Sequence, residues 1–251
     1  LVSNGCDAIT KLKKLDMMGE YTLPSDFSPK IKVITNPEEK TLTFIDNGLG
    51  MTSEEVDEYI NQIAFSGASD FLTKYKDKTN DDQIIGHFGL GFYSAFMVAT
   101  EVHIDTLSFR EGSTPVHWEC DGGTEYEMTE GTRTQVGTTI TLHLNEDCLE
   151  FANEYRVKEI LNKYCSFMPT EIFLEKENAP DEFETIELEE KKDSDKVIET
   201  ITEDEKEKLK ILKRPVPINE TQPLWTKNPS ECTDEDYKTF YRKRCKSNGL
   251  R

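Results

Sequence analysis

Hydrophobic residues recur at every third or fourth position over residues 1–15, which predicts that the chain opens within a helix. Two short apolar runs rich in β-branched residues follow at 31–34 and 42–45, with an Asn-Pro turn between them. This arrangement predicts a β-hairpin. Because no N-cap residue precedes the first helix, we expect its true start to lie before Leu1.

The next part of the chain alternates helical and polar patterns. Thr52 and Glu55 have the spacing of a capping box, which predicts a helix from there to about Ile63. The polar stretch 66–82 is long for a connection and is typical of a mobile lid. A second apolar helix is expected over 92–99, directly after a cluster of glycines.

Strand patterns dominate the chain after this point, with a helix and one more strand behind them. Consecutive strands joined by short turns favour an antiparallel sheet with helices on one face, so the fold class is α+β. The expected strands are 102–109, 116–120, 124–128, 137–144 and 171–175, and the expected helix is 153–164.

Composition divides the chain into three zones. Residues 1–176 read as one folded domain, 177–213 as an acidic, charged linker with few aromatic residues, and 214–251 as the truncated beginning of a further domain with an aromatic helix around Tyr237 and Phe240. The first two zones carry the acid excess, whereas the last is slightly basic.

The net charge of −19 argues against a surface that neutralises nucleic acid or an anionic membrane. No apolar run approaches the roughly 20 residues that span a bilayer, and the first residues lack the pattern of a signal peptide. The six cysteines are scattered without metal-ligand or disulfide spacing, so free thiols in a reducing cytoplasm are expected.

Three short motifs could carry chemistry. The first is the glycine cluster of Gly86, Gly89 and Gly91, which fits neither a Rossmann nor a Walker loop, because Ser94 and Phe92 stand where those loops need Gly and Lys. Glycines before a helix still let backbone amides approach an anion. The alternative is a helix start whose glycines only permit close packing.

The second motif is the run from Asp46 to Met51, where a carboxylate ends an apolar strand and Gly48 and Gly50 follow. Such a carboxylate can accept a hydrogen bond from the exocyclic amine of adenine, although an ordinary capped turn would look the same. The third motif is Asn4 with Asp7, three apart on the opening helix, which could meet Mg²⁺ and phosphates or be satisfied by the protein.

In this order, and with Gly137-Thr138 as a fourth element, the motifs resemble the nucleotide-binding motifs of the GHKL superfamily of gyrases, chaperones, histidine kinases and mismatch-repair ATPases. The runs 63–67, 85–94 and 224–228 are similar to the bacterial branch of the ninety-kilodalton heat-shock chaperones. The resemblance implies a two-layer α/β sandwich (the Bergerat fold) with ATP or ADP between helices and sheet.

The resemblance also implies roles for individual residues. Asp46 would bind the adenine amine, Asn4 would ligate Mg²⁺, and 66–82 would close as the lid. The complete set of expected cofactor-binding residues is Asn4, Asp7, Ala8, Lys11, Asp46, Gly50, Met51, Gly89, Leu90, Gly91, Phe92 and Thr138.

Two departures from the family pattern concern catalysis and the lid. Phe65 stands where the family usually has Lys. The general-base Glu of the family would precede Leu1, and its catalytic Arg would lie beyond Arg251. We therefore expect no catalytic residue in this chain, and ATP binding with negligible turnover.

The function implied by the resemblance is the ATP-binding domain of a stress-response (heat-shock) chaperone. Lid closure would be coupled to clamping on unfolded or partly folded client proteins, and the ATPase parent would be a homodimer through an absent C-terminal domain. The alternatives are the ATP domain of a histidine kinase, or a structural module that no longer binds nucleotide. Neither nucleic acid nor a membrane is expected as a partner.

Overall fold

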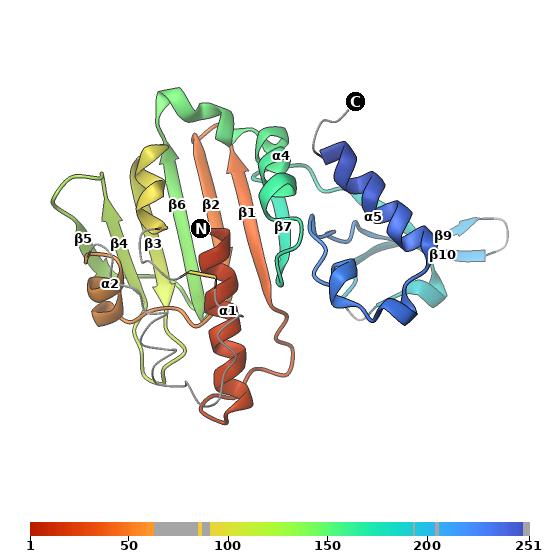
Figure 1. Ribbon diagram of the computed structural model, residues 1–251, viewed down its shortest axis with the longest axis horizontal. Coiled ribbons are helices and arrows are strands. Elements are labelled where there is room, and N and C mark those ends of the chain that lie inside the picture. The colour runs from red at the N-terminus through yellow and green to blue at the C-terminus, as the bar shows by residue number, and fades with distance from the viewer. Residues whose placement is uncertain (63–84, 87–90, 193, 204–205, 248–251) are drawn as a thin grey trace.

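The computed structural model describes residues 1–62, 85–86, 91–192, 194–203 and 206–247. Within these ranges, a seven-stranded sheet has the order β5-β4-β3-β6-β2-β1-β7 (Figure 1). Neighbouring strands are antiparallel except β1 and β7, which are parallel. The strands are β1 (Lys30–Asn36), β2 (Thr41–Asp46), β3 (Ala99–Leu107), β4 (Val116–Cys120), β5 (Glu127–Glu130), β6 (Gly137–Leu144) and β7 (Glu171–Lys176).

Helices cover one face of this sheet (Figure 1). The opening helix α1 (Val2–Met17) and the β1–β2 hairpin have the form that the sequence predicts. Thr52 caps α2 (Ser53–Tyr59) through the predicted capping box, and Asn153 caps α4 (Glu154–Tyr164). The α+β class with a mostly antiparallel sheet and helices on one face is therefore confirmed.

The hydrophobic core lies between the helices and the sheet. Alternation along β3 buries Val102 and Ile104 on the helix side and turns His103 and Asp105 to the other face. On α1, the side chain of Ile9 is fully buried against this layer. Burying a side chain of this size is worth about 1.5 to 3 kcal/mol, so this layer fixes where α1 sits on the sheet.

Two predicted helices are shorter than expected. The helix α2 ends at Tyr59, before the expected Ile63, which lies outside the described residues. The expected helix over 92–99 is a 3₁₀-helix, η2 (Phe92–Met97), and the chain enters β3 at Ala99. Pairing of β3 with β6 begins at Ala99, so the sheet leaves room for only six helical residues.

The acidic zone 177–213, predicted as a linker, contains three strands. These are β8 (Phe183–Glu187), β9 (Val197–Glu203) and β10 (Lys206–Leu212), which form an antiparallel sheet in the order β8-β10-β9. Ile186, Leu209 and Ile211 form its small core. Composition obscured these strands because charged residues and threonines are interspersed with the apolar residues in them.

The C-terminal zone packs against the end of the large sheet. Asn219 donates to the carbonyls of Met168 and Thr170 at 2.9 and 2.8 Å, and its Oδ1 accepts from the Ile172 amide. Trp225 packs edge-on against Phe167 with ring centroids 4.7 Å apart, and the tilted ring of Phe240 lies 5.7 Å from the same centroid. These contacts join the first predicted zone to the third, and the domain boundaries at 176 and 213 stay a prediction.

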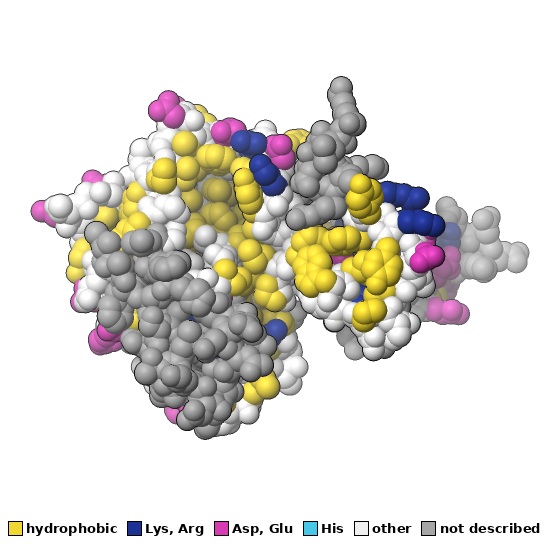
Figure 2. Space-filling view, viewed as in Figure 1, with side chains coloured by type: hydrophobic (Ala, Val, Ile, Leu, Met, Phe, Trp, Pro, Cys, Tyr) yellow, Lys and Arg dark blue, Asp and Glu magenta, His cyan; other side chains and the backbone are white. Residues whose placement is uncertain are grey.

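The aromatic helix expected near Tyr237 is α5 (Asp234–Ser247). Figure 2 shows apolar side chains on the surface of both the large domain and this C-terminal zone. No helix in the part of the chain that the structure describes is long and apolar enough to cross a membrane.

Candidate functional site

One face of α1 lies over the carboxyl end of β2. Ala8 packs so closely on the loop after β2 that a Cβ at Gly48 would lie 2.5 Å from the Cβ of Ala8 and 2.8 Å from the amide nitrogen of Ile9. A Cβ at Gly5 would similarly lie 3.2 Å from the Cβ of Asp46. Glycine at position 48 therefore allows the backbone of the loop to contact the helix directly.

Asp46 is the last residue of β2 and pairs with Thr138 at the start of β6. Its Oδ1 accepts a hydrogen bond from the Gly48 amide at 2.8 Å. Burial raises the pKa of the Asp46 carboxyl to about 7, although the Gly48 amide and the Arg133 guanidinium act in the opposite direction. A partly buried carboxylate of this kind can accept a hydrogen bond from a ligand that donates one.

The loop after Asp46 is fixed by a buried hydroxyl network. Thr106 on β3 accepts from the Met51 amide at 2.9 Å, and its hydroxyl lies 3.0 Å from that of Thr138. Gly50 has φ +63° and lies against the Leu107 carbonyl, where a Cβ would overlap the oxygen. Gly50, Met51 and Thr138 are thus held together beside Asp46.

Asp7 connects α1 to the second glycine motif. Its two carboxylate oxygens accept from the amides of Ile85 and Gly86 at 2.8 and 2.7 Å. One turn earlier, the exposed Asn4 has its Oδ1 3.7 Å from the position that a Cβ on Gly91 would occupy. The glycines therefore leave space in front of the Asn4 side-chain oxygen.

Of the remaining predicted residues, Lys11 lies near the site, the Phe92 ring lies in the core, and the others lie outside the described residues. Lys11 lies on α1 one turn after Asp7 and Ala8, and is partly buried. The Phe92 ring belongs to the core, where it packs on Trp118 at 5.9 Å. Gly89 and Leu90, together with Phe65 and the expected lid 66–82, lie outside the described residues.

Sequence reasoning missed two residues that shape the site. Thr106 is fully buried and holds both Met51 and Thr138 in place. Arg133 donates to the Asp46 carbonyl at 3.2 Å and to the hydroxyl of Thr139. Neither had a signal in the sequence, since a threonine in a strand is ordinary and Arg133 lies outside every motif.

The raised pKa of Asp46 predicts a pH dependence of stability. In the unfolded chain the carboxyl ionises near pH 4, whereas in the folded chain its pKa is about 7. Between pH 4 and pH 7 the folded state therefore holds a proton on Asp46 that the unfolded state has lost. Relative to high pH, this proton stabilises the folded state fully below about pH 4, and the stabilisation is lost as the pH rises through 7. Asp46→Asn, which imitates the protonated group, should be the more stable protein at pH 8.

Urea unfolding of the wild type and Asp46→Asn at pH 5 and pH 8 tests this directly. Between pH 5 and pH 8 the difference in unfolding free energy should shift in favour of Asp46→Asn by up to about 3 kcal/mol, and by less where water reaches the carboxyl. The same difference at both pH values would show that the carboxyl is hydrated and not enclosed.

Asp7→Asn is expected to loosen the chain at Ile85 and Gly86. An amide side chain offers one oxygen in place of two and turns an N–H group toward a backbone donor, which costs about 1 to 3 kcal/mol. Amide hydrogen exchange at residues 85 and 86 should become faster. As a control, Asp16→Asn should affect only the Leu23 amide, which donates one hydrogen bond of 2.9 Å to the Asp16 side chain. Equal changes in exchange at residues 85 and 86 in both variants would contradict the assignment.

Two family models match this chain. Residues 1–160 match the family described as histidine kinase-, DNA gyrase B-, and HSP90-like ATPase, and residues 150–249 match the Hsp90 protein family. The chain belongs to the HSP90-like ATPase family. The first match spans α1, the β1–β2 hairpin and β6, which carry the described site residues Asp7, Asp46 and Thr138.

Relatives of this chain have one name in common. This chain is 46% identical over 244 residues to the chaperone protein HtpG of Bacteroides thetaiotaomicron, 42% identical over 242 residues to that of Porphyromonas gingivalis, and 37% identical over 244 residues to that of Escherichia coli. These matches cover 96% to 97% of this chain but only 31% to 35% of each relative. The chain thus spans about a third of the length of these chaperones.

Proposed function

We propose that this chain is the ATP-binding domain of an ATP-dependent molecular chaperone. The observation that carries the proposal is the partly buried Asp46 carboxylate, which lies under α1 beside Thr138 and the Gly50 loop. A flat base that lies over this loop can donate its exocyclic amine to Asp46. Such a charge-assisted bond is worth about 1.5 to 3 kcal/mol, enough to select adenine.

The residues present also fit a phosphate group with Mg²⁺. The net charge of −19 excludes binding through bulk positive charge, so the phosphates need backbone amides and a cation. The side-chain oxygen of Asn4 faces the space left by Gly86 and Gly91 and is the kind of hard oxygen donor that Mg²⁺ accepts. Bound Mg²⁺ would neutralise phosphate charge, while the amides of 89–92 would hold the phosphates.

The wider role follows from the family and the relatives' printed name. In the whole protein, ATP binding would close the segment 66–82 over the nucleotide, and hydrolysis would drive a cycle of clamping on unfolded or partly folded client proteins. The proposal includes a homodimer through a domain absent here. It also places the protein in the cytoplasm, consistent with free thiols at the five described cysteines.

Calorimetric titration of ATP and ADP, with and without Mg²⁺, tests the phosphate half of the proposal. Wild type should bind both nucleotides more tightly with Mg²⁺. Asn4→Ala should keep binding in a chelator but lose most of the gain from Mg²⁺, because Asn4 is exposed and its removal leaves the fold intact. If the gain from Mg²⁺ is unchanged in Asn4→Ala, Asn4 is not the ligand.

A further inference from the structure

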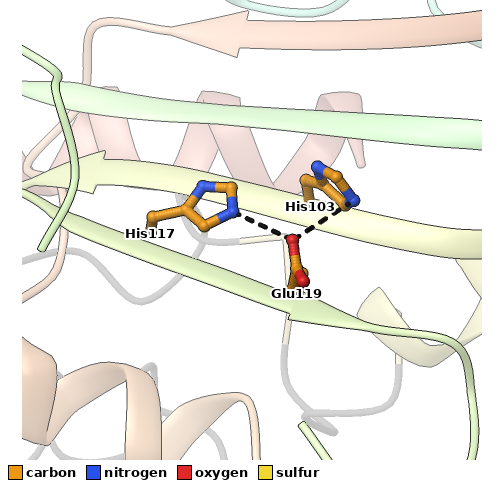
Figure 3. A group of neighbouring side chains, drawn as sticks. All are labelled: His103, His117 and Glu119. Carbon is orange, nitrogen blue, oxygen red and sulfur yellow. Dashed lines mark hydrogen bonds and ion pairs between the residues drawn. The ribbon is translucent and has the colours of Figure 1, made fainter. Parts of the chain in front are cut away.

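The open face of the large sheet carries a cluster of histidine and carboxylate side chains, remote from the helix-covered face (Figure 3). In the antiparallel register of β3 and β4, His103 pairs with Glu119 and Asp105 pairs with His117. Since strand residues two apart point to the same face, the four side chains stand together. They are only partly exposed: His103 24%, His117 26% and Glu119 35%.

One oxygen of Glu119 faces two imidazole nitrogens. Its Oε2 lies 3.2 Å from Nε2 of His117 and 3.7 Å from Nε2 of His103, and one donor atom from each residue lies within 4.8 Å of the others. Around a tetrahedral Zn²⁺ with bonds near 2.0 to 2.2 Å, neighbouring ligand atoms are about 3.3 to 3.6 Å apart. The two distances bracket that value, so small side-chain movements suffice to bind an ion.

Asp105 gives His117 the support that metal-binding histidines usually have. Its Oδ1 lies 2.8 Å from Nδ1 of His117. A histidine that donates Nδ1–H to a carboxylate presents the lone pair of Nε2 to the ion, which fixes the tautomer and makes the nitrogen more basic. On the other side, Glu101 lies 2.9 Å from Nε2 of His103 and would have to release that contact when an ion binds.

We propose that His103, His117 and Glu119 form a binding site for a divalent transition-metal ion, with Zn²⁺ as the expected ion. Two imidazoles and one carboxylate are a ligand set that Zn²⁺ accepts in proteins, and they leave a fourth position for water. The site joins β3 to β4 on rigid strands of the sheet, where β3 has neighbours on both sides. Hard ions such as Mg²⁺ are not expected, because they prefer all-oxygen ligands.

Calorimetric titration of ZnCl₂ into the untagged, chelator-treated chain at about pH 8, where free imidazoles are neutral, tests the proposal. One ion should bind with a Kd below about 100 µM. His117→Gln and Glu119→Gln should each abolish this binding, while far-UV circular dichroism shows that both variants are folded. Asp105→Asn should weaken it by about tenfold to a hundredfold, since it removes only the support of His117.

A cysteine thiolate is the main competing ligand for Zn²⁺, and Cys120 follows Glu119 on β4. Cys120→Ser should bind Zn²⁺ as the wild type does, and Co²⁺ in the site should show tetrahedral ligand-field bands without a thiolate charge-transfer band. The proposal is overturned by a Kd weaker than 100 µM, by binding that survives His117→Gln, or by a thiolate band. It stands apart from nucleotide binding, since none of these readouts requires ATP or ADP.

Discussion

Asp46→Asn is expected to weaken ADP binding by about tenfold to a hundredfold, which for a millimolar ligand removes detectable heat in a titration. The substitution replaces an acceptor that carries charge with a neutral amide, and so removes about 1.5 to 3 kcal/mol of charge-assisted hydrogen bonding to the adenine amine. The Asp46 side chain also accepts from Gly48, which the Asn oxygen can still do, so the loop should keep its shape.

Asp57→Asn is the matched control for this prediction. Asp57 lies on α2, where it accepts from Asn61 at 2.9 Å and Tyr126 at 3.1 Å, outside the candidate site. This variant should bind ADP with the wild-type affinity. Wild-type affinity in Asp46→Asn would show that the carboxylate does not contact the base, and the assignment of the adenine position would then be wrong.

Gly50→Ala is expected to destabilise the domain by about 3 kcal/mol or more. A Cβ there would overlap the carbonyl oxygen of Leu107 and lie 2.5 Å from the Leu107 carbonyl carbon, while φ of +63° is itself unfavourable for alanine. Relief of this overlap moves the loop away from β3 and breaks two hydrogen bonds of 2.9 Å. In one the Phe109 amide donates to the Leu49 carbonyl, and in the other the Met51 amide donates to the Thr106 hydroxyl.

Gly19→Ala separates the steric part of this effect from the conformational part. Gly19 has φ +74°, and nothing lies within 4 Å of the position of its Cβ, so only the backbone conformation is penalised, by about 1 kcal/mol. Urea unfolding of both variants measures the difference. Similar losses in both would mean that the loop after β2 moves freely away from Leu107.

Sequence patterns were sufficient for most of the large sheet. The hairpin, the capping box at Thr52 and the capped helix after Asn153 each depend on local chemistry that a short window contains. The strands β8 to β10 were missed because a marginal sheet with three core residues has the composition of a solvated linker. The 3₁₀ form of η2 depends on where β3 begins to pair with β6, which is a tertiary contact.

The candidate site was predictable where glycine or a helix face made a position unusual. Asp7 and Asp46 stood out because polar residues interrupt apolar patterns there, and the structure buries Asp7 and partly buries Asp46. Thr106 was not predictable, because its role depends on Met51 and Thr138, which come from other parts of the chain. The cluster of His103, His117 and Glu119 was not predictable for the same reason, since only strand register brings His103 to Glu119.

Parallel titrations of ADP and GDP, each with Mg²⁺, into the wild-type chain test the central claim most directly. Adenine donates from its exocyclic amine, whereas guanine has a carbonyl oxygen at that ring position, whose lone pairs would face the carboxylate of Asp46. We predict that ADP binds at about the millimolar level or tighter, about −4 kcal/mol or better, and that GDP binds at least tenfold more weakly. Equal affinities, or no heat from ADP with a folded protein, would contradict the account.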